Sequence, residues 1–347
     1  MDEIMIAYIN DLLKVSSLDL PWEKLEGKNV LITGASGLIG GCLVDMLMLN
    51  PNINYHVYAS GRNKRNLKER FCSYLSSSYF SILEYDVTKS LSSDIDFHYI
   101  VAAASGASPQ IYSTNPVGVI KANILGVDNL LSYGVEHSLE KFIYISSGEV
   151  YGEGDGRVFD EDYSGYVNCA SVRACYPSSK RASETLCEAY AHQYGVDVSI
   201  VRPCHVYGPR FTPNDKRVYA QFIRNVLKGE DIVMKSDGKQ FRSWCYVVDC
   251  ISAIMYVMLK GKNGDAYNIA DETSNISIRS LAEMIATISG QHVVVDLPTE
   301  IEKTGFNVVT KSVFSTKKLE KLGWTVRGTM FEKMEKTIME SKDFVKL

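Results

Sequence analysis

From residue 29 onward, short apolar runs alternate with longer segments in which apolar residues recur every three or four positions. The short runs predict buried strands, and the longer segments predict helices with one apolar face. The predicted strands cover residues 30–33, 56–60, 81–84, 99–103, 142–146 and 197–202. The predicted helices cover residues 4–15, 38–49, 63–76, 116–133 and 177–194.

Strand and helix alternate with the spacing that is typical of α/β proteins, so we expect a Rossmann-like, doubly wound parallel sheet with helices on both faces. After residue 202, glycine and proline become frequent and the elements become shorter. We therefore expect a dinucleotide-binding domain formed by residues 1–203 and about 241–261. Residues 204–240 and 262–347 are expected to form a smaller, interleaved C-terminal substrate lobe. A helix near 248–260 is predicted to return to the sheet.

Composition narrows the class of protein. The chain has 347 residues, of which 46% are hydrophobic, and a net charge of -4, so no basic face for nucleic acid is expected. Its apolar runs are shorter than a membrane span, and residues 1–14 do not resemble a signal peptide. The eight cysteines form no CxxC pair and have no histidine at a metal-ligand spacing. We expect a cytoplasmic protein with reduced thiols, without a metal or a membrane anchor.

A glycine-rich turn follows the first predicted strand, where residues 29–40 read NVLITGASGLIG. Glycines permit a tight turn and a close backbone approach to pyrophosphate, which then meets free N–H groups and the helix dipole. A purely structural turn is the alternative, but its place between the first strand and a helix favours dinucleotide binding. The candidate cofactor-binding residues are Gly34, Ser36, Gly37, Leu38, Ile39 and Gly40.

The choice between NAD and NADP depends on the end of the second strand. A carboxylate that binds the ribose is expected there, but residues 59–62 read ASGR. Arg62 could bind a 2′-phosphate or could lie in solvent at a helix start. The residues alone therefore leave both cofactors open.

Tyr176 and Lys180 are four residues apart at the start of a predicted helix, which places them on one face. A lysine ammonium and a positive nicotinamide ring would lower the pKa of the tyrosine, so that it could take a proton from a hydroxyl group. With 21 tyrosines in the chain, the spacing could arise by chance. Ser147 and Glu149 follow the fifth predicted strand, at the edge where open α/β sheets bind ligands. Ser147 could bond the same hydroxyl or cap a turn, and Glu149 could be an acid or base or a loop residue.

With these motifs, the chain from about residue 27 to 323 resembles the extended short-chain dehydrogenase/reductase family of nucleotide-sugar epimerases, dehydratases and decarboxylases. The glycine pattern, Ser147, Tyr176 and Lys180 match, as do the dipeptide at 202–203 and the run at 242–249. Within the family, the chain is most similar to UDP-glucuronate decarboxylases. The segments that carry this similarity are AASGASPQIYSTNPVGVIKAN (103–123), RACYPSSKRASETL (173–186) and VRPCHVYGPR (201–210).

This resemblance implies NAD as the cofactor, a nucleotide-sugar substrate and a homodimer formed through the helices at 116–133 and 177–194. It adds Asp86, Val87, Ala103, Asn123 and Pro203 to the cofactor-binding candidates. For the substrate, Arg210 and Arg242 could bind the diphosphate, Arg173 the sugar carboxylate, and Tyr112 and His205 the sugar. Packing or surface roles are the alternatives for each of these five residues.

The implied reaction is a decarboxylation of UDP-glucuronate through a 4-keto intermediate, with the hydride returned to the same sugar. Three features depart from the family pattern, and the first is the missing acid after the second strand. Gly148 stands where decarboxylases usually have serine and 4,6-dehydratases have aspartate, which disfavours a dehydratase, and Gly106 replaces a proline. The alternatives are a 4-epimerase, an NADPH-dependent 4-ketoreductase and, in another class, a cofactor-sensing protein without catalysis.

Overall fold

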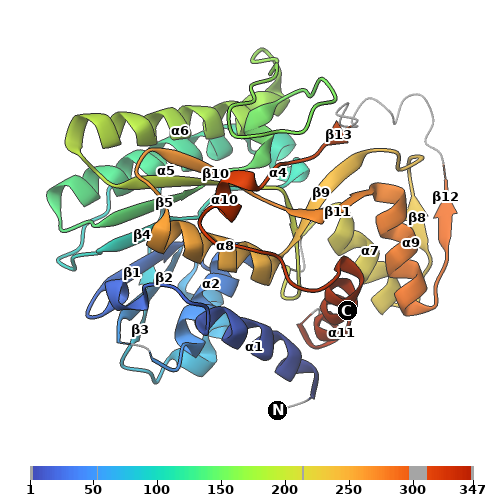
Figure 1. The fold of residues 1–347 in the computed structure, drawn as a ribbon, viewed down its shortest axis with the longest axis horizontal. Coiled ribbons are helices and arrows are strands. Elements are labelled where there is room, and N and C mark those ends of the chain that lie inside the picture. The colour runs from blue at the N-terminus through green and yellow to red at the C-terminus, as the bar shows by residue number, and fades with distance from the viewer. Residues whose placement is uncertain (1–2, 53, 213–214, 297–310, 345–347) are drawn as a thin grey trace.

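A computed structural model describes residues 3–52, 54–212, 215–296 and 311–344. Its centre is a seven-stranded sheet in which every pair of neighbouring strands is parallel (Figure 1). The strand order is β10-β6-β5-β4-β1-β2-β3. The strands are β1 (Asn29–Thr33), β2 (His56–Gly61), β3 (Phe80–Glu84), β4 (Tyr99–Ala102), β5 (Lys141–Ile145), β6 (Val198–Pro203) and β10 (Asp265–Ile269). The predicted Rossmann-like class is confirmed.

The strands are apolar throughout because both faces of the sheet are covered. In β1, Val30 and Ile32 belong to one buried cluster, while Leu31 between them belongs to the cluster on the other face. In β5, Ile143 and Phe142 divide in the same way. Alternate residues thus fill two separate cores, which is why the period-two pattern is hidden within continuous apolar runs.

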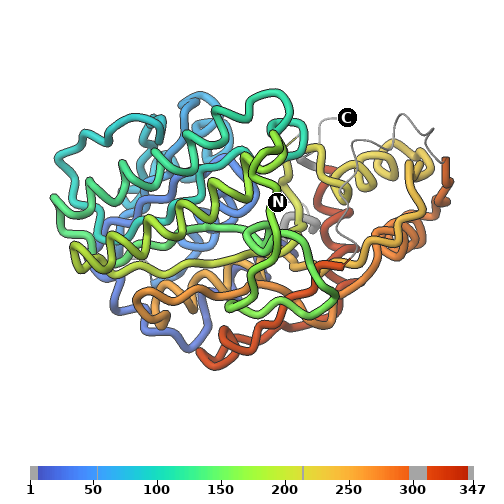
Figure 2. Tube along the Cα trace, turned by 90° about the horizontal axis from the view of Figure 1, so that it is seen from above, coloured from blue at the N-terminus to red at the C-terminus, as the bar shows by residue number. Residues whose placement is uncertain are grey.

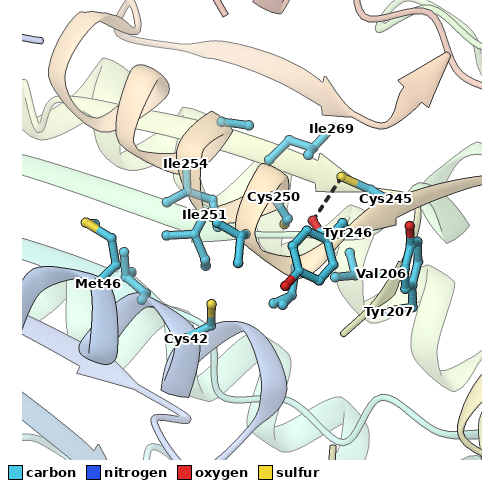
Figure 3. Close-up of a cluster of buried hydrophobic side chains, with 14 of the residues drawn as sticks. Cys42, Met46, Val206, Tyr207, Cys245, Tyr246, Cys250, Ile251, Ile254 and Ile269 are labelled. Carbon is cyan, nitrogen blue, oxygen red and sulfur yellow. Dashed lines mark hydrogen bonds between the residues drawn. The ribbon is translucent and has the colours of Figure 1, made fainter. Parts of the chain in front are cut away.

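Helices form a layer on each face of the sheet (Figure 1). On one face, α5 (Pro116–Glu136) and α6 (Cys175–Tyr194) pack along each other. On the other face lie α1 (Glu3–Ser16), α2 (Leu38–Leu49) and α8 (Val247–Lys260). Figure 3 shows the core between α2 and α8, where Cys42 and Met46 lie opposite Ile251 and Ile254.

The smaller lobe lies beyond one end of the sheet, as Figures 1 and 2 show. It contains a four-stranded sheet of β7 (His205–Tyr207), β9 (Phe241–Tyr246), β11 (Asp271–Ser277) and β13 (Lys311–Ser312). A second sheet pairs β8 (Ile232–Met234) with β12 (Val293–Val295). Its helices are α7 (Val218–Leu227) and α9 (Ile278–Ser289), while α10 (Lys317–Glu320) and α11 (Met330–Phe344) lead back to the main sheet and to α1.

Three details differ from the expectations. The helix predicted at 63–76 is shorter, with α3 (Lys64–Arg70) followed by a 3-10 turn (Cys72–Tyr74), because Phe71 and Tyr74 turn inward to pack on Phe80. Strand β10 comes from the range assigned to the lobe, yet it forms an edge of the main sheet beside β6. Strand β9 comes from the range assigned to the main domain, yet it belongs to the lobe's sheet. The exact domain boundaries remain a prediction.

Candidate active site

The glycine turn lies where β1 and β4 end side by side. Gly34 has a φ of 64°, and a Cβ atom there would lie 2.7 Å from the Ala103 carbonyl oxygen. A Cβ at Gly40 would lie 2.6 Å from the Gly34 carbonyl oxygen, so glycine is required at both positions. Helix α2 begins at Leu38 without a side-chain cap, and Ser36 and Gly37 are exposed. The first-turn N–H groups, including that of Ile39, therefore fit a dinucleotide diphosphate.

The ends of β2 and β3 lie beside this turn. The Asp86 carboxylate accepts hydrogen bonds from the backbone N–H and hydroxyl of Thr88, at 3.0 and 2.9 Å. These bonds and the charge of Arg62 lower the pKa of Asp86 below its usual value. Val87 is buried, and its carbonyl accepts a 2.8 Å bond from Asn129. The contacts of Asp86 and Val87 are those of a well-held loop, and their cofactor roles remain predictions.

Asn123 is buried in α5 and donates a 2.8 Å hydrogen bond to the hydroxyl of Ser179. That hydroxyl in turn donates to the Cys175 carbonyl at 2.6 Å, so Asn123 ties α5 to the first turns of α6. Ala103 follows β4, and its N–H donates to the Thr33 hydroxyl at 3.2 Å. Pro203 is the last residue of β6. Ala103 and Pro203 thus lie at carboxyl ends of strands, as the dinucleotide hypothesis requires.

Tyr176 and Lys180 lie in the first turns of α6, and both side chains are buried. The Lys180 ammonium donates a 2.6 Å hydrogen bond to the carbonyl of Ile145, the last residue of β5. The same nitrogen lies 5.8 Å from the centre of the Tyr176 ring and 4.7 Å from that of Tyr144. The structure therefore brings this pair to the carboxyl end of a central strand.

Ser147 begins the 3-10 turn Gly148–Tyr151, where its hydroxyl accepts a 3.2 Å bond from the Glu149 N–H. Burial and the nearby Glu149 charge raise the pKa of Tyr176 to about 12, although hydrogen bonding with Ser147 and Tyr112 acts in the opposite direction. Burial also lowers the pKa of Lys180 to about 7. The side chains around Tyr176 thus hold its pKa above the usual value, because the hydroxyl is desolvated and lies near a carboxylate.

Glu149, Arg173 and Tyr112 form one contiguous group with Tyr176. One Arg173 guanidinium nitrogen lies 2.7 Å from both carboxylate oxygens of Glu149. The guanidinium also lies 4.7 Å over the Tyr112 ring, which stacks on the Tyr176 ring at 4.7 Å. In the structure, Arg173 thus positions Glu149 beside the tyrosine that we expect to be catalytic.

His205, Arg242 and Arg217 form a second group of basic side chains, which comes from the lobe. His205 is exposed at the start of β7, with its ring 5.2 Å from that of Trp244. Desolvation of the ring, followed by the charges of Arg242 and Arg217, lowers the pKa of His205 to about 4 although part of the side chain reaches the surface. The charge of Arg217 also acts on Tyr176. Arg217 was not predicted, because it lies in a loop without a motif, where its side chain bonds Asp215 at 2.5 Å.

Arg210 is directed elsewhere. It has a φ of 62°, in the left-handed region, and its guanidinium lies 3.9 Å from Asp45 and 5.3 Å over the Tyr8 ring. This turn directs the side chain toward α1 and α2, so the structure does not bring it to the group around Tyr176. Of the other substrate candidates, Tyr112 stacks on Tyr176, and Arg173 lies over the Tyr112 ring. Arg242 interacts electrostatically with Glu149 and with His205.

The described residues contain neither a group of metal ligands nor a helix that could span a membrane. Within 3–52, 54–212, 215–296 and 311–344, no three His, Cys, Asp or Glu side chains gather as metal ligands would. In the same ranges, no helix combines the length and the apolar character that crossing a membrane requires.

Comparison with curated proteins finds relatives along most of the chain. UDP-glucuronic acid decarboxylase 5 of Arabidopsis thaliana is 34% identical over 298 residues, which cover 85% of this chain and 84% of the relative. UDP-glucuronic acid decarboxylase 1 of Xenopus tropicalis is 35% identical over 233 residues, which cover 67% of this chain and 53% of the relative.

Solved structures share the fold. The UDP-glucose 4-epimerase of Thermotoga maritima, solved with UDP-glucose, has a TM-score of 0.76 at 25% identity and covers 90% of this chain and 98% of its own. The UDP-glucuronic acid 4-epimerase of Bacillus cereus, solved with UDP-glucuronic acid and NAD, has a TM-score of 0.77 at 23% identity and covers 92% and 99%. The model of the NAD dependent epimerase/dehydratase family matches residues 30–270. The chain, with its glycine turn and its Ser147, Tyr176 and Lys180 at the sheet edge, belongs to this family of enzymes.

Proposed function

We propose that this chain is a nucleotide-sugar enzyme that decarboxylates UDP-glucuronate and leaves its cofactor unchanged after each cycle. The observation that carries the proposal is the gathering of Ser147, Tyr176 and Lys180 at the carboxyl end of β5. Open α/β sheets bind ligands at this edge. The names of the curated relatives support the choice of a uronic acid as the sugar.

The glycine turn and the N-terminus of α2 would hold the diphosphate of NAD. When bound, NAD would accept a hydride from C4 of the sugar and later return it to the same carbon. Tyr176 would take the proton of the 4-hydroxyl, for which its pKa of about 12 must fall in the complex. A positive charge near the phenol supplies such a decrease: the charge of Arg217 already acts in this direction, and the Lys180 ammonium lies 5.8 Å from the ring centre.

The ketone at C4 makes the uronic acid a β-keto acid. The bond from C5 to the carboxyl carbon breaks, carbon dioxide leaves, and the electron pair moves onto the C4 oxygen. Ser147 and Tyr176 would donate hydrogen bonds to that oxyanion. A proton then adds to C5, and Glu149, acting through water, is the candidate donor.

Arginines recognise the anionic parts of such a substrate. Arg173 holds a carboxylate already, that of Glu149, and could exchange it for the sugar carboxylate. The charges of Arg242 and Arg217 both act on His205, so these two side chains lie on the same side of the site. Two guanidinium groups there suit the diphosphate of the nucleotide. Arg210, which lies against Asp45, is no longer our choice for this role.

Two other reactions use the same residues. A 4-epimerase would let the ketone rotate before the hydride returns, and the solved 4-epimerases have this fold. A 4-ketoreductase using NADPH would suit Arg62, because β2 ends at Gly61 without a carboxylate. A binding protein without catalysis would not need Ser147, Tyr176 and Lys180 together.

The test is to incubate the purified chain with UDP-glucuronate and NAD and to analyse the products by mass spectrometry. Carbon dioxide and a UDP-pentose are expected. UDP-galacturonate would instead identify an epimerase, and a reaction that consumes NADPH with a 4-keto sugar nucleotide would identify a reductase. The absence of any turnover would favour the binding protein.

The same assay tests the role of the tyrosine. Tyr176→Phe should lower kcat by roughly 100-fold or more, which is the usual effect of removing a general base. Tyr194→Phe is the matched control, because Tyr194 ends the same helix and is 52% exposed. An unchanged rate in Tyr176→Phe would remove this residue from the mechanism.

A further inference from the structure

Gly148 lies between the two candidate catalytic residues Ser147 and Glu149. Its backbone does not require glycine, since Gly148 is not among the residues with positive φ. The space around this position does require glycine. A Cβ atom at Gly148 would lie 2.2 Å from Cζ and 2.5 Å from Cε1 of Phe314. The aromatic ring of a distant residue thus occupies the volume that a side chain at position 148 would need.

Phe314 is buried between two other aromatic rings and is fixed by backbone hydrogen bonds. It is 1% exposed, and its ring centre lies 5.5 Å from that of Tyr151 and 5.7 Å from that of Phe159. Its backbone N–H donates a 3.0 Å hydrogen bond to the hydroxyl of Ser243. The residues on either side bond the backbone of Phe159, at 2.7 and 2.8 Å. The ring therefore has no room to move away from a larger residue at position 148.

The same segment connects the lobe to the catalytic turn. Phe314 follows β13, which pairs with β9, and Ser312 lies opposite Arg242 in that pairing. The Ser243 hydroxyl that accepts from Phe314 belongs to β9 as well. One strand of the lobe thus carries a candidate substrate arginine and also supports the residue on which Gly148 packs.

We propose that Phe314 is a positioning residue of the active site. Its ring takes the place of a side chain at position 148 and fixes the turn that carries Ser147 and Glu149. The contact that holds this turn is thus apolar and comes from the lobe. The catalytic part of this inference rests on the proposed function, whereas the packing part does not.

The test is a pair of complementary substitutions. Gly148→Ala adds the overlapping Cβ, and Phe314→Leu removes Cζ and both Cε atoms, which are the atoms it would overlap. Gly148→Ala should lower the melting temperature by roughly 3–6 °C through overpacking. It should lower kcat on UDP-glucuronate by roughly 30-fold, with KM changed less than about threefold, because a small displacement of catalytic groups is costly. The double variant should recover most of both losses.

Phe159→Leu provides the matched control. Phe159 belongs to the same buried aromatic cluster but is not among the atoms nearest to position 148. Phe159→Leu should restore neither the kcat nor the melting temperature of Gly148→Ala. Equal recovery with Phe159→Leu, or wild-type kcat and melting temperature in Gly148→Ala, would overturn the proposal. If the wild type does not turn over UDP-glucuronate, the proposed function fails. The recovery of the melting temperature then still decides whether Phe314 and Gly148 are coupled, and kcat is measured with the substrate that the product assay identifies.

Discussion

Lys180 illustrates how burial changes a single residue. The side chain is 2% exposed and its ammonium bonds the backbone of β5, so the charged form has lost nearly all its water. This desolvation lowers the pKa of Lys180 from 10.5 to about 7, which leaves the residue able to gain or lose its proton near neutral pH. Because this cation is buried beside Tyr176, the stability of the fold depends on pH.

The sign of this dependence follows from the two pKa values. Below about pH 7, Lys180 is charged in both states, and burying the charge destabilises the fold. Between about 7 and 10.5, the unfolded chain keeps the proton that the folded chain has lost, so this site stabilises the fold increasingly as pH rises. The difference in melting temperature, Lys180→Met minus wild type, should fall by roughly 5 °C between about pH 6 and 9.

Differential scanning fluorimetry across this pH range measures the difference. Lys317→Met is the control, because Lys317 is exposed on α10 and should give a flat profile. A flat profile for Lys180→Met as well would show that the buried ammonium does not titrate in this range.

Local spacing was enough to predict that Ser147, Tyr176 and Lys180 lie close together, because a strand end and one helix face bring them to the same edge. It was not enough for Arg217 or Phe314, which reach the site from the lobe through tertiary packing alone. Nor could it show that the left-handed backbone of Arg210 turns that side chain toward Asp45.

At the scale of elements, the helices near the two chain ends pack on each other. Helix α11 contacts α1, where Lys336 bonds Asp11 at 2.8 Å. Lys333 bonds Asp249 of α8 at 2.7 Å. Glu340 is buried in this contact. Desolvation raises the pKa of Glu340 to about 8, and the nearby charge of Asp11 acts in the same direction, whereas a hydrogen bond with the Tyr8 backbone lowers it.

The raised pKa of Glu340 makes stability depend on pH in the direction opposite to that caused by the lowered pKa of Lys180. Below about pH 4.5, Glu340 is protonated in both states, and between about 4.5 and 8 the folded chain keeps a proton that the unfolded chain has released. Stability from this site is therefore lost as pH rises to about 8. Glu340→Gln should gain roughly 3 °C or more in melting temperature over wild type between about pH 5 and 8.5.

The exposed Glu335 on the same helix offers Glu335→Gln as the control, and its profile should follow the wild type. A gain that is independent of pH in Glu340→Gln would mean that the carboxyl group is already ionised in the folded chain.

Elements with strong apolar runs were predicted to within a few residues, because burial on both sheet faces makes those runs continuous. Strand β10 was missed because it reads DAYNI, with polar Asp265 and Asn268 among its apolar residues. Asn268 is nevertheless buried, since its side chain bonds Tyr151 and the backbone of Phe159. Such compensation is visible only in the folded chain.

At the scale of the whole molecule, we propose a homodimer through α5 and α6. Helix α5 exposes Val117 by 60%, Ile120 by 39% and Leu125 by 40%, although these are large apolar side chains. An apolar helix face of this kind gains free energy when a second copy covers it. The family resemblance in the sequence implies the same two helices.

Ile120→Arg should convert the dimer to a monomer, because the charge would be buried in the interface. The molar mass measured by multi-angle light scattering should then fall from about twice 38.7 kDa to 38.7 kDa. Val233→Arg, at a valine of the lobe that is 45% exposed, should leave the dimer intact. A wild-type mass of one chain at micromolar concentration would contradict the dimer.

The position of β10 bears on the order in which the nascent chain can fold. Some 60 residues separate the end of β6 from β10, and α8 lies among them. At roughly 5–20 residues per second, the ribosome needs several seconds to synthesise that interval. Until then, the outer edge of β6 has no neighbouring strand and the face that α8 later covers is open to solvent. The interval between the synthesis of these two strands is therefore the time when this edge is exposed to pairing with other chains.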